Sequence, residues 1–428
     1  MKYIRILKVP EVKFVQGKLK ITTVVTIVSD LHDKFLQVPI NLAVSLLKCK
    51  DSEKLHFHQW EVPYTARYPD EKLELEIPES VYKRLHQFND YDQSDPGLAS
   101  LCIHAPGTDG SAFGDTIGSI KGKGVLPPIV SAWVDFCVIS KDARSTTAEP
   151  LLRREFCSLD GPQLEVWERI GDYMAGHIWD AGLVLAAYVD HLIIARPGHL
   201  AQDFSKMKLL NVIELGCGCG IVSKHFASLV SRSKVVATDY SSIEERNLRI
   251  ADSQSLLEFV ELDWSTVPDA GDRPSQRQRS WPPSLDKRLD RTWDMILISD
   301  CTYNWDSFAD LVRTISWLSK PSRKHIAIVV ASKKRDDRES EFFNLMRSNG
   351  FRIANAVRIP MPKAEPEEDE VENTDIFVFK HASATDFASA APEAAAASPI
   401  GHLWRVAWDV KDSRCAEIKK DRGIPDNA

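Results

Sequence analysis

The residues whose types and spacing point most clearly to chemistry lie in the stretch Val-Ile-Glu-Leu-Gly-Cys-Gly-Cys-Gly, which ends at Gly220. Gly216, Gly218 and Gly220 let the backbone approach a ligand closely, as at a turn from a buried strand into a helix whose first amides face that ligand. Glu214 indicates a ligand that carries positive charge or donates hydrogen bonds. A dinucleotide-binding loop has the spacing G-x-G-x-x-G, but Ile221 stands where its third glycine would be. The spacing therefore favours a pocket for a cationic or zwitterionic nucleoside over a pyrophosphate site.

Acidic residues occupy the carboxyl ends of four predicted strands, and they are Glu214, Asp239, Asp263 and Asp300. Each alone is as well explained as a helix cap or a turn residue, but the ends of parallel strands meet along one edge of a sheet, where ligands bind. Asp239 follows the glycine loop by about twenty residues, the position from which a carboxylate binds ribose hydroxyls. Trp264 could border a nucleobase, and a tryptophan of the core is the alternative interpretation.

These residues are positioned by strands that alternate with helices from about residue 160 onward. Predicted strands cover 208–215, 234–238, 257–262, 293–299, 325–331, 351–359 and 375–380, and predicted helices cover 180–195, 222–230 and 337–348. A further helix follows Asp300, with Ser307-x-x-Asp310 as a capping box. The alternation predicts an α/β fold with a doubly wound, mostly parallel sheet whose last two strands form a hairpin. Residues 402–409 also alternate like a strand and are an alternative to 375–380 as the last one.

The chain divides into three regions. Residues 1–150 contain short β-branched or alternating runs and predict a β-rich accessory domain; the runs lie at 19–29, 38–48, 55–64, 71–77, 100–104 and 129–139. Residues 160–381 hold the α/β domain, which includes an arginine-rich insert at 265–292 and an acidic loop at 365–372, expected to be a solvated hairpin end. Residues 382–428 begin with an Ala-rich tract and are predicted to be a flexible linker and tail.

Composition restricts the class of protein. A chain of 428 residues is long enough for two domains, and 43% hydrophobic with 27% charged residues is typical of a soluble globular protein. A formal net charge of −7 disfavours nucleic acid as the main partner. No apolar run has the length of a membrane span, and Lys8 interrupts any N-terminal signal core. The eight cysteines form no C-x-x-C pair, so we expect no metal site and a cytoplasmic location, with the nucleus as a second one.

Four motifs together resemble the seven-β-strand S-adenosylmethionine-dependent methyltransferases; they are Glu-Leu-Gly-Cys-Gly-Cys-Gly, Thr238-Asp239, Leu262-Asp263-Trp264 and Asp300-Cys301-Thr302-Tyr303. More narrowly, they are similar to the family 16 protein-lysine methyltransferases. The stretch Gly-His-Ile-Trp-Asp-Ala-Gly that ends at Gly182 also matches the segment ahead of that family's core. The resemblance covers residues 165–380 of this chain. It implies a Rossmann-like sheet of seven strands and S-adenosylmethionine as the cofactor.

The resemblance also implies roles for individual residues. The glycines would line the methionine and ribose portions of the cofactor, Asp239 would bind the ribose hydroxyls and Trp264 would border the adenine. With Glu214 added, the expected cofactor-binding residues are Trp179, Glu214, Gly216, Gly218, Gly220, Asp239, Asp263, Trp264 and Ser299. Asp300 and Tyr303 match the family's Asp-x-x-Tyr signature, which is linked to the target lysine and to catalysis. A packing aromatic at the start of a helix is the alternative for Tyr303.

The expected function is methyl transfer to a lysine side chain of a protein, such as a translation factor or a chaperone. Methyl transfer is an in-line displacement at a sulfonium, and the lysine must first lose a proton, which desolvation and a nearby carboxylate favour. Asp300 is the candidate for holding the amine. The alternatives are a small-molecule N-methyltransferase and a catalytically silent adaptor that binds a partner through residues 1–150. The arginines of 265–292 either contact an acidic protein substrate or are merely solvated.

Overall fold

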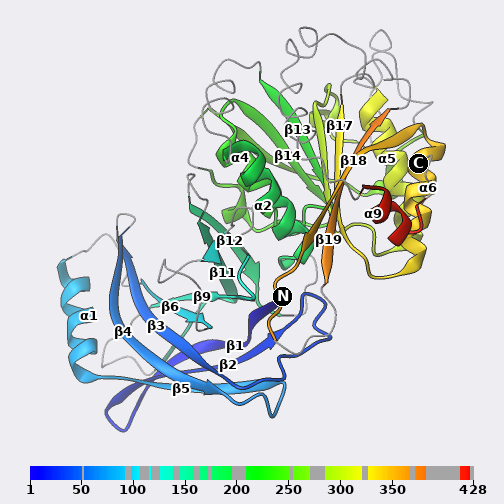
Figure 1. Ribbon diagram of the computed structural model, residues 1–428. Coiled ribbons are helices and arrows are strands. Elements are labelled where there is room, and N and C mark those ends of the chain that lie inside the picture. The colour runs from blue at the N-terminus through cyan, green and yellow to red at the C-terminus, as the bar shows by residue number, and fades with distance from the viewer. Residues whose placement is uncertain are drawn as a thin grey trace.

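A computed structural model gives the arrangement of the chain (Figure 1). It describes residues 1–50, 53–91, 98–105, 115–116, 126–137, 145–157, 163–171, 176–194, 209–250, 254–269, 285–320, 326–365, 372–381 and 415–424. The N-terminal part forms a β-sandwich that packs against an α/β domain formed by the remainder. The two parts of the predicted architecture are therefore both present.

The β-sandwich consists of two sheets and one flanking helix. Its elements are β1 (Lys2–Val15), β2 (Lys18–Val28), β3 (Ile40–Lys50), β4 (Glu53–Tyr64), β5 (Asp70–Ile77), α1 (Glu79–Tyr91), β6 (Leu98–His104), β7 (Asp115–Thr116), β8 (Ile129–Val130), β9 (Ala132–Cys137), β10 (Ser145–Thr147), β11 (Leu151–Cys157) and β12 (Gln163–Arg169). One sheet has the order β10-β1-β2-β5 and the other has the order β12-β11-β9-β6-β3-β4. Ile21 and Leu73 of the first sheet share a buried core with Leu42 and Val134 of the second. Along β5, leucine and isoleucine alternate inward while charged residues face outward, as the sequence predicted.

The β-rich domain extends beyond residue 150, where the sequence placed its end. β11 and β12 pair with each other and join the second sheet through β9, so the sandwich ends at Arg169. β1 was missed by the sequence reasoning as well. Its pairing with β2 shifts register on both sides of Lys8, and such irregularities break the strict alternation that identifies a strand in a sequence.

The α/β domain is built on a seven-stranded sheet with the order β15-β14-β13-β16-β17-β19-β18. The strands are β13 (Leu210–Leu215), β14 (Ser233–Asp239), β15 (Leu256–Glu261), β16 (Met295–Ser299), β17 (Ala327–Lys333), β18 (Phe351–Pro360) and β19 (Asn373–His381). The first five are parallel, and β19 is antiparallel to both β17 and β18. The doubly wound sheet with a terminal hairpin is confirmed, with 375–380 inside its last strand. Residues 402–409 lie outside the described residues.

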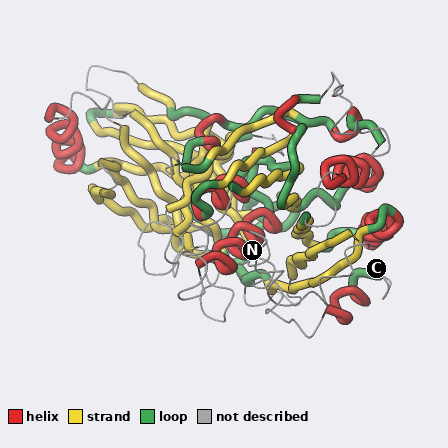
Figure 2. Tube along the Cα trace, turned by 90° about the horizontal axis from the view of Figure 1, so that it is seen from above, coloured by secondary structure: helices red, strands yellow, loops and turns green. Residues whose placement is uncertain are grey.

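Helices cover both faces of this sheet (Figures 1 and 2). On one face lie α2 (Asp180–Ile194) and α4 (Ile221–Leu229), and on the other lie α5 (Phe308–Ser319), α6 (Ser340–Ser348) and α9 (Cys415–Asp421). Because β13 is buried on both faces, it reads as a continuous apolar run, with Val212 in one core and Ile213 in the other. The sheet thereby brings the carboxyl ends of β13 to β16 to one edge.

Two local predictions for the α/β domain are wrong. Ser307 does not form a capping box, because its hydroxyl donates to the backbone oxygen of Asn304 at 2.8 Å and the helix end has no side-chain cap. The acidic loop 365–372 is not simply a solvated hairpin end at its described residues. Glu372 pairs with Lys34 and with Lys333 at 2.7 Å each, and Glu365 is buried. Both glutamates therefore contribute to the boundary with the β-sandwich.

The C-terminal segment 415–424 belongs to the fold rather than to a flexible tail. Ile418 and Ile424 are buried in the core beneath α5 and α6. Arg422 is buried as well; its Nε lies 2.7 Å from Asp375 Oδ2 and its Nη1 lies 3.0 Å from Glu339 Oε2. The sequence hid this element because it is short and follows a long low-complexity tract.

The two domains are joined by buried polar contacts. Glu168 of β12 is fully buried and accepts from Arg5 of β1 at 2.8 Å and from the backbone N–H of Ile178 at 3.0 Å. The Tyr3 hydroxyl donates to Asp180 at the start of α2, at 2.8 Å. The Glu168–Ile178 and Tyr3–Asp180 hydrogen bonds cross from the β-sandwich to the α/β domain and give these buried polar groups their partners.

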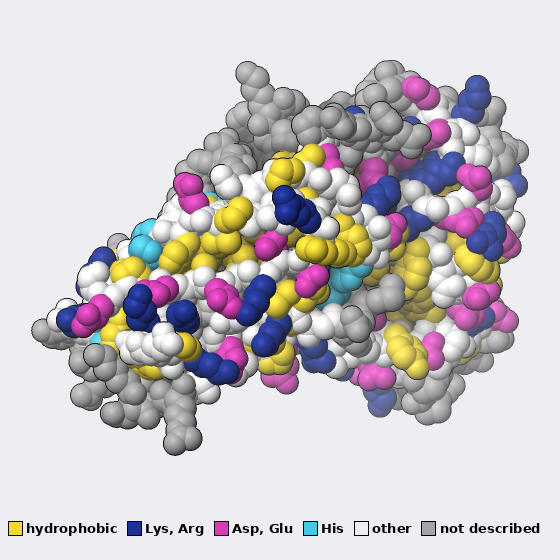
Figure 3. Space-filling model, turned by 90° about the horizontal axis from the view of Figure 1, so that it is seen from below, with side chains coloured by type: hydrophobic (Ala, Val, Ile, Leu, Met, Phe, Trp, Pro, Cys, Tyr) yellow, Lys and Arg dark blue, Asp and Glu magenta, His cyan; other side chains and the backbone are white. Residues whose placement is uncertain are grey.

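The surface carries charges of both signs. On the face shown in Figure 3, Lys and Arg side chains are interspersed with Asp and Glu. Within the described part of the chain, no helix is long and apolar enough to cross a membrane.

Candidate active site

The glycine loop after β13 has a backbone that side chains would not tolerate. Gly216, Gly218 and Gly220 have φ values of 65°, 53° and 76°, in the left-handed region that favours glycine. A Cβ at Gly216 would lie 2.5 Å from Cys301 Sγ and 3.3 Å from the ring of Trp264. The loop is therefore packed tightly against the neighbouring strand ends.

A cavity of about 610 Å³ opens beside this loop, at the carboxyl ends of β13 to β16. The predicted site residues that line it are Trp179, Gly216, Gly218, Asp239, Asp263, Trp264, Ser299, Asp300 and Tyr303. They come from five separate segments between 179 and 303, and the sheet brings these segments together. The predicted convergence of strand ends at one edge of the sheet is present, and the cavity lies at that edge.

Two predicted cofactor residues, Glu214 and Gly220, are not among those that line the cavity. Glu214 is fully buried behind the loop, where its Oε2 accepts from the backbone N–H of Ser223 in α4 at 2.9 Å. Burial raises the pKa of Glu214 to about 7. Gly220 is the N-cap of α4, and a Cβ there would lie 2.5 Å from Ile243 Cδ1. Both residues position the loop instead of facing the ligand space.

Asp239 holds the loop and also faces the cavity. Its Oδ2 accepts from Gly218 N at 2.8 Å and its Oδ1 accepts from Tyr240 N at 2.7 Å. Burial raises its pKa, which the hydrogen bonds from these backbone N–H groups partly oppose. A carboxylate has about four acceptor positions, so each oxygen retains capacity for a hydroxyl donor. Asp239 thus fits a ribose diol.

Asp263 and Trp264 form the adjacent wall. Asp263 Oδ1 accepts from Ser265 N at 2.8 Å and caps the 3-10 helix Trp264–Thr266. The Trp264 ring lies over Gly216 and borders the cavity, and it also packs, partly buried, against the core on that side of the sheet. Its buried indole N–H has no acceptor among the described residues. An aromatic face beside a glycine backbone suits a purine, and the site therefore fits S-adenosylmethionine.

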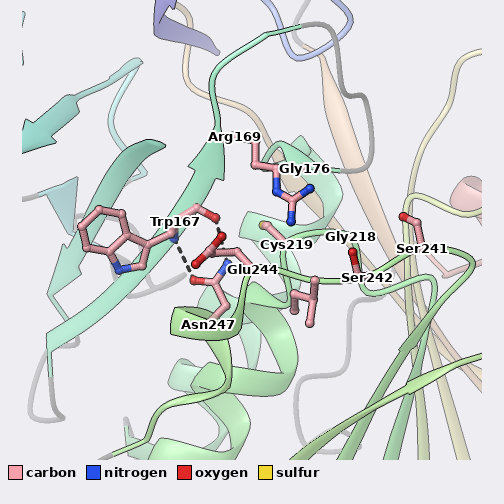
Figure 4. Close-up of a pocket in the computed structure, with 10 residues that line it drawn as sticks. Trp167, Arg169, Gly176, Gly218, Cys219, Ser241, Ser242, Glu244 and Asn247 are labelled. Atoms are coloured by element: carbon pink, nitrogen blue, oxygen red, sulfur yellow. Dashed lines mark hydrogen bonds between the residues drawn. The ribbon is translucent and has the colours of Figure 1, made fainter. Parts of the chain in front are cut away.

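A second hollow, of about 10 Å³, lies on the other side of Gly218 (Figure 4). This volume holds about one water molecule. Beside it, Asn247 exchanges two hydrogen bonds of 2.8 Å with the backbone of Trp167 in β12. The last strand of the β-sandwich is thereby fastened to the segment that supports the glycine loop.

Asp300 follows β16 in a strained conformation. Its φ is 53°, which is uncommon for a residue other than glycine and is often found at functional sites. Arg335, which follows β17, approaches Asp300 with Nη2 at 2.7 Å from Oδ2 and Nε at 3.4 Å from Oδ1. Burial raises the pKa of Asp300 to about 6, and the Arg335 charge opposes that rise. The group is thus a carboxylate at neutral pH that titrates close to it.

Tyr303 and Trp179 flank the mouth of the cavity next to Asp300. Their rings are nearly parallel, with centroids 6.4 Å apart and an interplanar angle of 6°. Tyr303 is 54% exposed, so it is not the packing aromatic that was its alternative interpretation. An aliphatic chain or an ammonium group can lie against such ring faces. The aromatic pair and the carboxylate together suit a lysine side chain.

Sequence reasoning missed two charged residues that hold Asp300. Arg335 follows a strand end like the predicted carboxylates, and that position could have identified it. Asp30 belongs to the β-sandwich, yet its Oδ2 lies 2.8 Å from Arg335 Nη2. No local signal in the sequence marks a residue that acts across a domain boundary.

The geometry can be compared with known proteins. A family described as lysine methyltransferase matches residues 158–349. This segment is therefore similar to that lysine methyltransferase family. The methyltransferase match begins ahead of β12 and ends at the close of α6, so it takes in the glycine loop, the cavity and Asp300.

Individual relatives are similar to parts of this chain. A UPF0665 family protein of Schizosaccharomyces pombe is 32% identical over 178 residues, which are 41% of this chain and 48% of that protein. Protein N-lysine methyltransferase METTL21A of Xenopus tropicalis is 28% identical over 50% of this chain and 79% of its own length. Protein-lysine N-methyltransferase EFM6 of Saccharomyces cerevisiae is 27% identical over 44% of this chain and 76% of its own. The chain thus spans about half the length of the first of these relatives.

Proposed function

We propose that this chain is an S-adenosylmethionine-dependent methyltransferase that acts on a lysine side chain of a protein. The observation that carries the proposal is the buried carboxylate of Asp300, which lines the glycine-loop cavity together with the aromatic pair Trp179 and Tyr303. The family match and the names of the relatives support the same activity.

Residues around the cavity divide into those that hold the cofactor and those that receive the amine. Gly216 and Gly218 offer backbone at close approach, Asp239 would accept from the ribose hydroxyls and Trp264 would stack beside the adenine. When bound, the cofactor supplies a methyl group on a positively charged sulfur. Positioning of the acceptor then provides much of the rate enhancement, since the reaction is an in-line displacement.

The target lysine must arrive as a free amine. A lysine that enters between Trp179 and Tyr303 loses part of its hydration, which lowers its pKa. Asp300, ionised at neutral pH, accepts a hydrogen bond from the amine and fixes the direction of its lone pair. Arg335 keeps the carboxylate in place. Proton loss and alignment are thus both provided at the mouth of the cavity.

A translation factor or a chaperone is the class of protein substrate that we propose, in line with the resemblance to family 16. The proposed location is the cytoplasm, with the nucleus as a second one. The arginine-rich insert offers a contact for an acidic substrate, but its described arginines are already occupied. Arg288 pairs with Asp286 at 2.7 Å, and Arg291 lies 3.8 Å from Glu258.

The test is incubation of the purified protein with labelled S-adenosylmethionine and a lysate from cells whose gene for this protein has been deleted. A labelled protein band that yields methyl-lysine on digestion supports the proposal, and mass spectrometry of the band identifies the substrate. Asp300→Asn should abolish labelling while calorimetry still detects cofactor binding. Label that appears only in small molecules would favour a small-molecule N-methyltransferase. Absence of cofactor binding by the unaltered protein would favour the silent adaptor.

A further inference from the structure

One side chain of the β-sandwich reaches the proposed active site. Asp30 lies just after β2 and is buried, with 3% of its surface exposed. Its Oδ2 is 2.8 Å from Arg335 Nη2, the nitrogen that is also 2.7 Å from Asp300 Oδ2. A single guanidinium nitrogen therefore joins a carboxylate of the N-terminal domain to the candidate catalytic carboxylate.

We propose that Asp30 is a positioning residue for Asp300, acting through Arg335, so that the β-sandwich completes the methyl-transfer site. This inference rests on the proposed function. The planar guanidinium has donors in a fixed fork, and carboxylates on both sides of Arg335 determine its orientation. Arg335 also lies 5.5 Å from the ring of Trp179, one of the two aromatics at the mouth of the cavity. Asp30 thus constrains the carboxylate and the aromatic wall together.

The burial of this cluster makes the constraint strong. The side chains of Asp30, Arg335 and Asp300 are 1%, 11% and 7% exposed. Loss of the Asp30 charge leaves Arg335 with Asp300 as its ion-pair partner, so the guanidinium would be drawn towards Asp300. A strained residue such as Asp300 keeps its conformation only while its neighbours hold it. We therefore expect loss of Asp30 to disturb the rate of transfer more than the binding of the cofactor.

The charges around the cluster give the inference a direction with pH. The charged and titratable groups that interact with Asp30 or Asp300 come from three elements. They are Lys333 and Arg335 at and after the end of β17, Asp180 at the start of α2, and Tyr3 and Arg5 of β1. The negative charge of Asp30 raises the pKa of Asp300, whereas Arg335 lowers it. Replacement of Asp30 by asparagine removes the negative charge that raises the pKa of Asp300. It also leaves Asp300 as the carboxylate that pairs with Arg335. Both changes lower the pKa of Asp300, so the acid limb of the rate profile should move to lower pH.

The experiment compares Asp30→Asn with Glu149→Gln. Glu149 also forms an ion pair across the domain boundary, with Arg246 at 2.7 Å, but it lies away from Asp300. For Asp30→Asn we expect kcat to fall about 10- to 100-fold. We also expect the cofactor affinity measured by calorimetry to stay unchanged and the acid limb of the pH–rate profile to move to lower pH. Glu149→Gln should leave all three unchanged. If Asp30→Asn keeps the kcat and pH profile of Glu149→Gln, the proposal is overturned.

A second measurement separates this inference from the proposed function. Asp30→Asn and Asp300→Asn share Arg335, so their effects on Tm should be non-additive in the double variant, whether or not a substrate is known. Additive changes in Tm would refute the link through Arg335. If the unaltered protein shows neither cofactor binding nor transfer, the proposed function fails while this coupling is still measured. If Asp30→Asn does not fold, Arg335→Lys replaces it in this test, because lysine keeps the positive charge but lacks the planar guanidinium. Its effect on Tm should likewise be non-additive with that of Asp300→Asn.

Discussion

Gly216→Ala is the substitution whose effect the structure defines most sharply. The left-handed backbone at Gly216 would cost alanine about 1–2 kcal/mol. The added Cβ would also lie 2.5 Å from Cys301 Sγ, and overpacking of this kind costs about 1–3 kcal/mol. The free energy of unfolding should therefore fall by about 2–5 kcal/mol.

Gly17→Ala is the matched control. Gly17 has a φ of 81°, and a Cβ there would meet no atom within 4 Å, so only the backbone contribution of about 1–2 kcal/mol applies. Urea unfolding of both variants separates the steric part from the backbone part. Cys301→Ala in the Gly216→Ala background should restore the steric part, with Cys301→Ala alone as the reference.

Cofactor binding gives the second readout for Gly216→Ala. Relief of the clash must move Trp264 or Cys301, which both line the cavity. We expect S-adenosylmethionine to bind about tenfold more weakly, equivalent to about 1.4 kcal/mol. Gly17→Ala should bind it normally. If Gly216→Ala matches Gly17→Ala in stability and matches the unaltered protein in affinity, the description of the loop as a tightly packed cradle is wrong.

Three further predictions follow from other contacts. Asp239→Ala should weaken cofactor binding by about 1.5–3 kcal/mol in calorimetry, the value of hydrogen bonds to a charged group, and undiminished affinity would contradict its assignment to the ribose. Glu214→Gln should alter the pH dependence of stability. Burial raises the folded-state pKa of Glu214 from 4.5 to about 7. The free energy of unfolding of the unaltered protein should therefore fall by about 3 kcal/mol relative to the variant as the pH rises from 4.5 to about 7. Parallel curves of unfolding free energy against pH for the two proteins would exclude this. Arg422→Leu leaves the buried carboxylate of Glu339 without its arginine and leaves Asp375 paired with Arg358 only. The free energy of unfolding measured in urea should fall by about 3–5 kcal/mol, whereas a loss below about 1 kcal/mol would show that this residue does not anchor α9.

The edge of the sheet that carries the candidate site was predictable, because the carboxyl ends of parallel strands all lie at one edge. Asp239, Asp263 and Asp300 each follow an apolar strand, and strands of one direction must end on one side. The same rule failed for Glu214, which stands one residue before the end of β13. Side chains alternate along a strand, so this single position turns the carboxylate to the buried side, where it holds α4.

Features that depend on contacts between distant segments could not be predicted. Asp30 and Arg335 are separated by more than 300 residues, and neither stands in a pattern that identifies its partner. The end of the β-sandwich was placed too early for a related reason. β11 and β12 lie close to the α/β domain in sequence, but their pairing with each other and with β9 assigns them to the sandwich. α9 is similar, because its role depends on Asp375 and Glu339, which lie far ahead of it in the chain.

Four residues with left-handed backbone lie at the proposed active site, and buried side chains hold the elements that carry them. The loop glycines have positive φ, as does Asp300 on the neighbouring strand end. Glu214, buried behind the loop, accepts a hydrogen bond from the start of α4, and Asp239 accepts one from the backbone N–H of Gly218. Arg335 donates to the carboxylate of Asp300. Strain of this kind persists only where the surroundings over-determine it. The supports therefore keep the cradle and the carboxylate in place before any ligand arrives, so substitutions at Glu214 or Arg335 should impair function without removing a ligand contact.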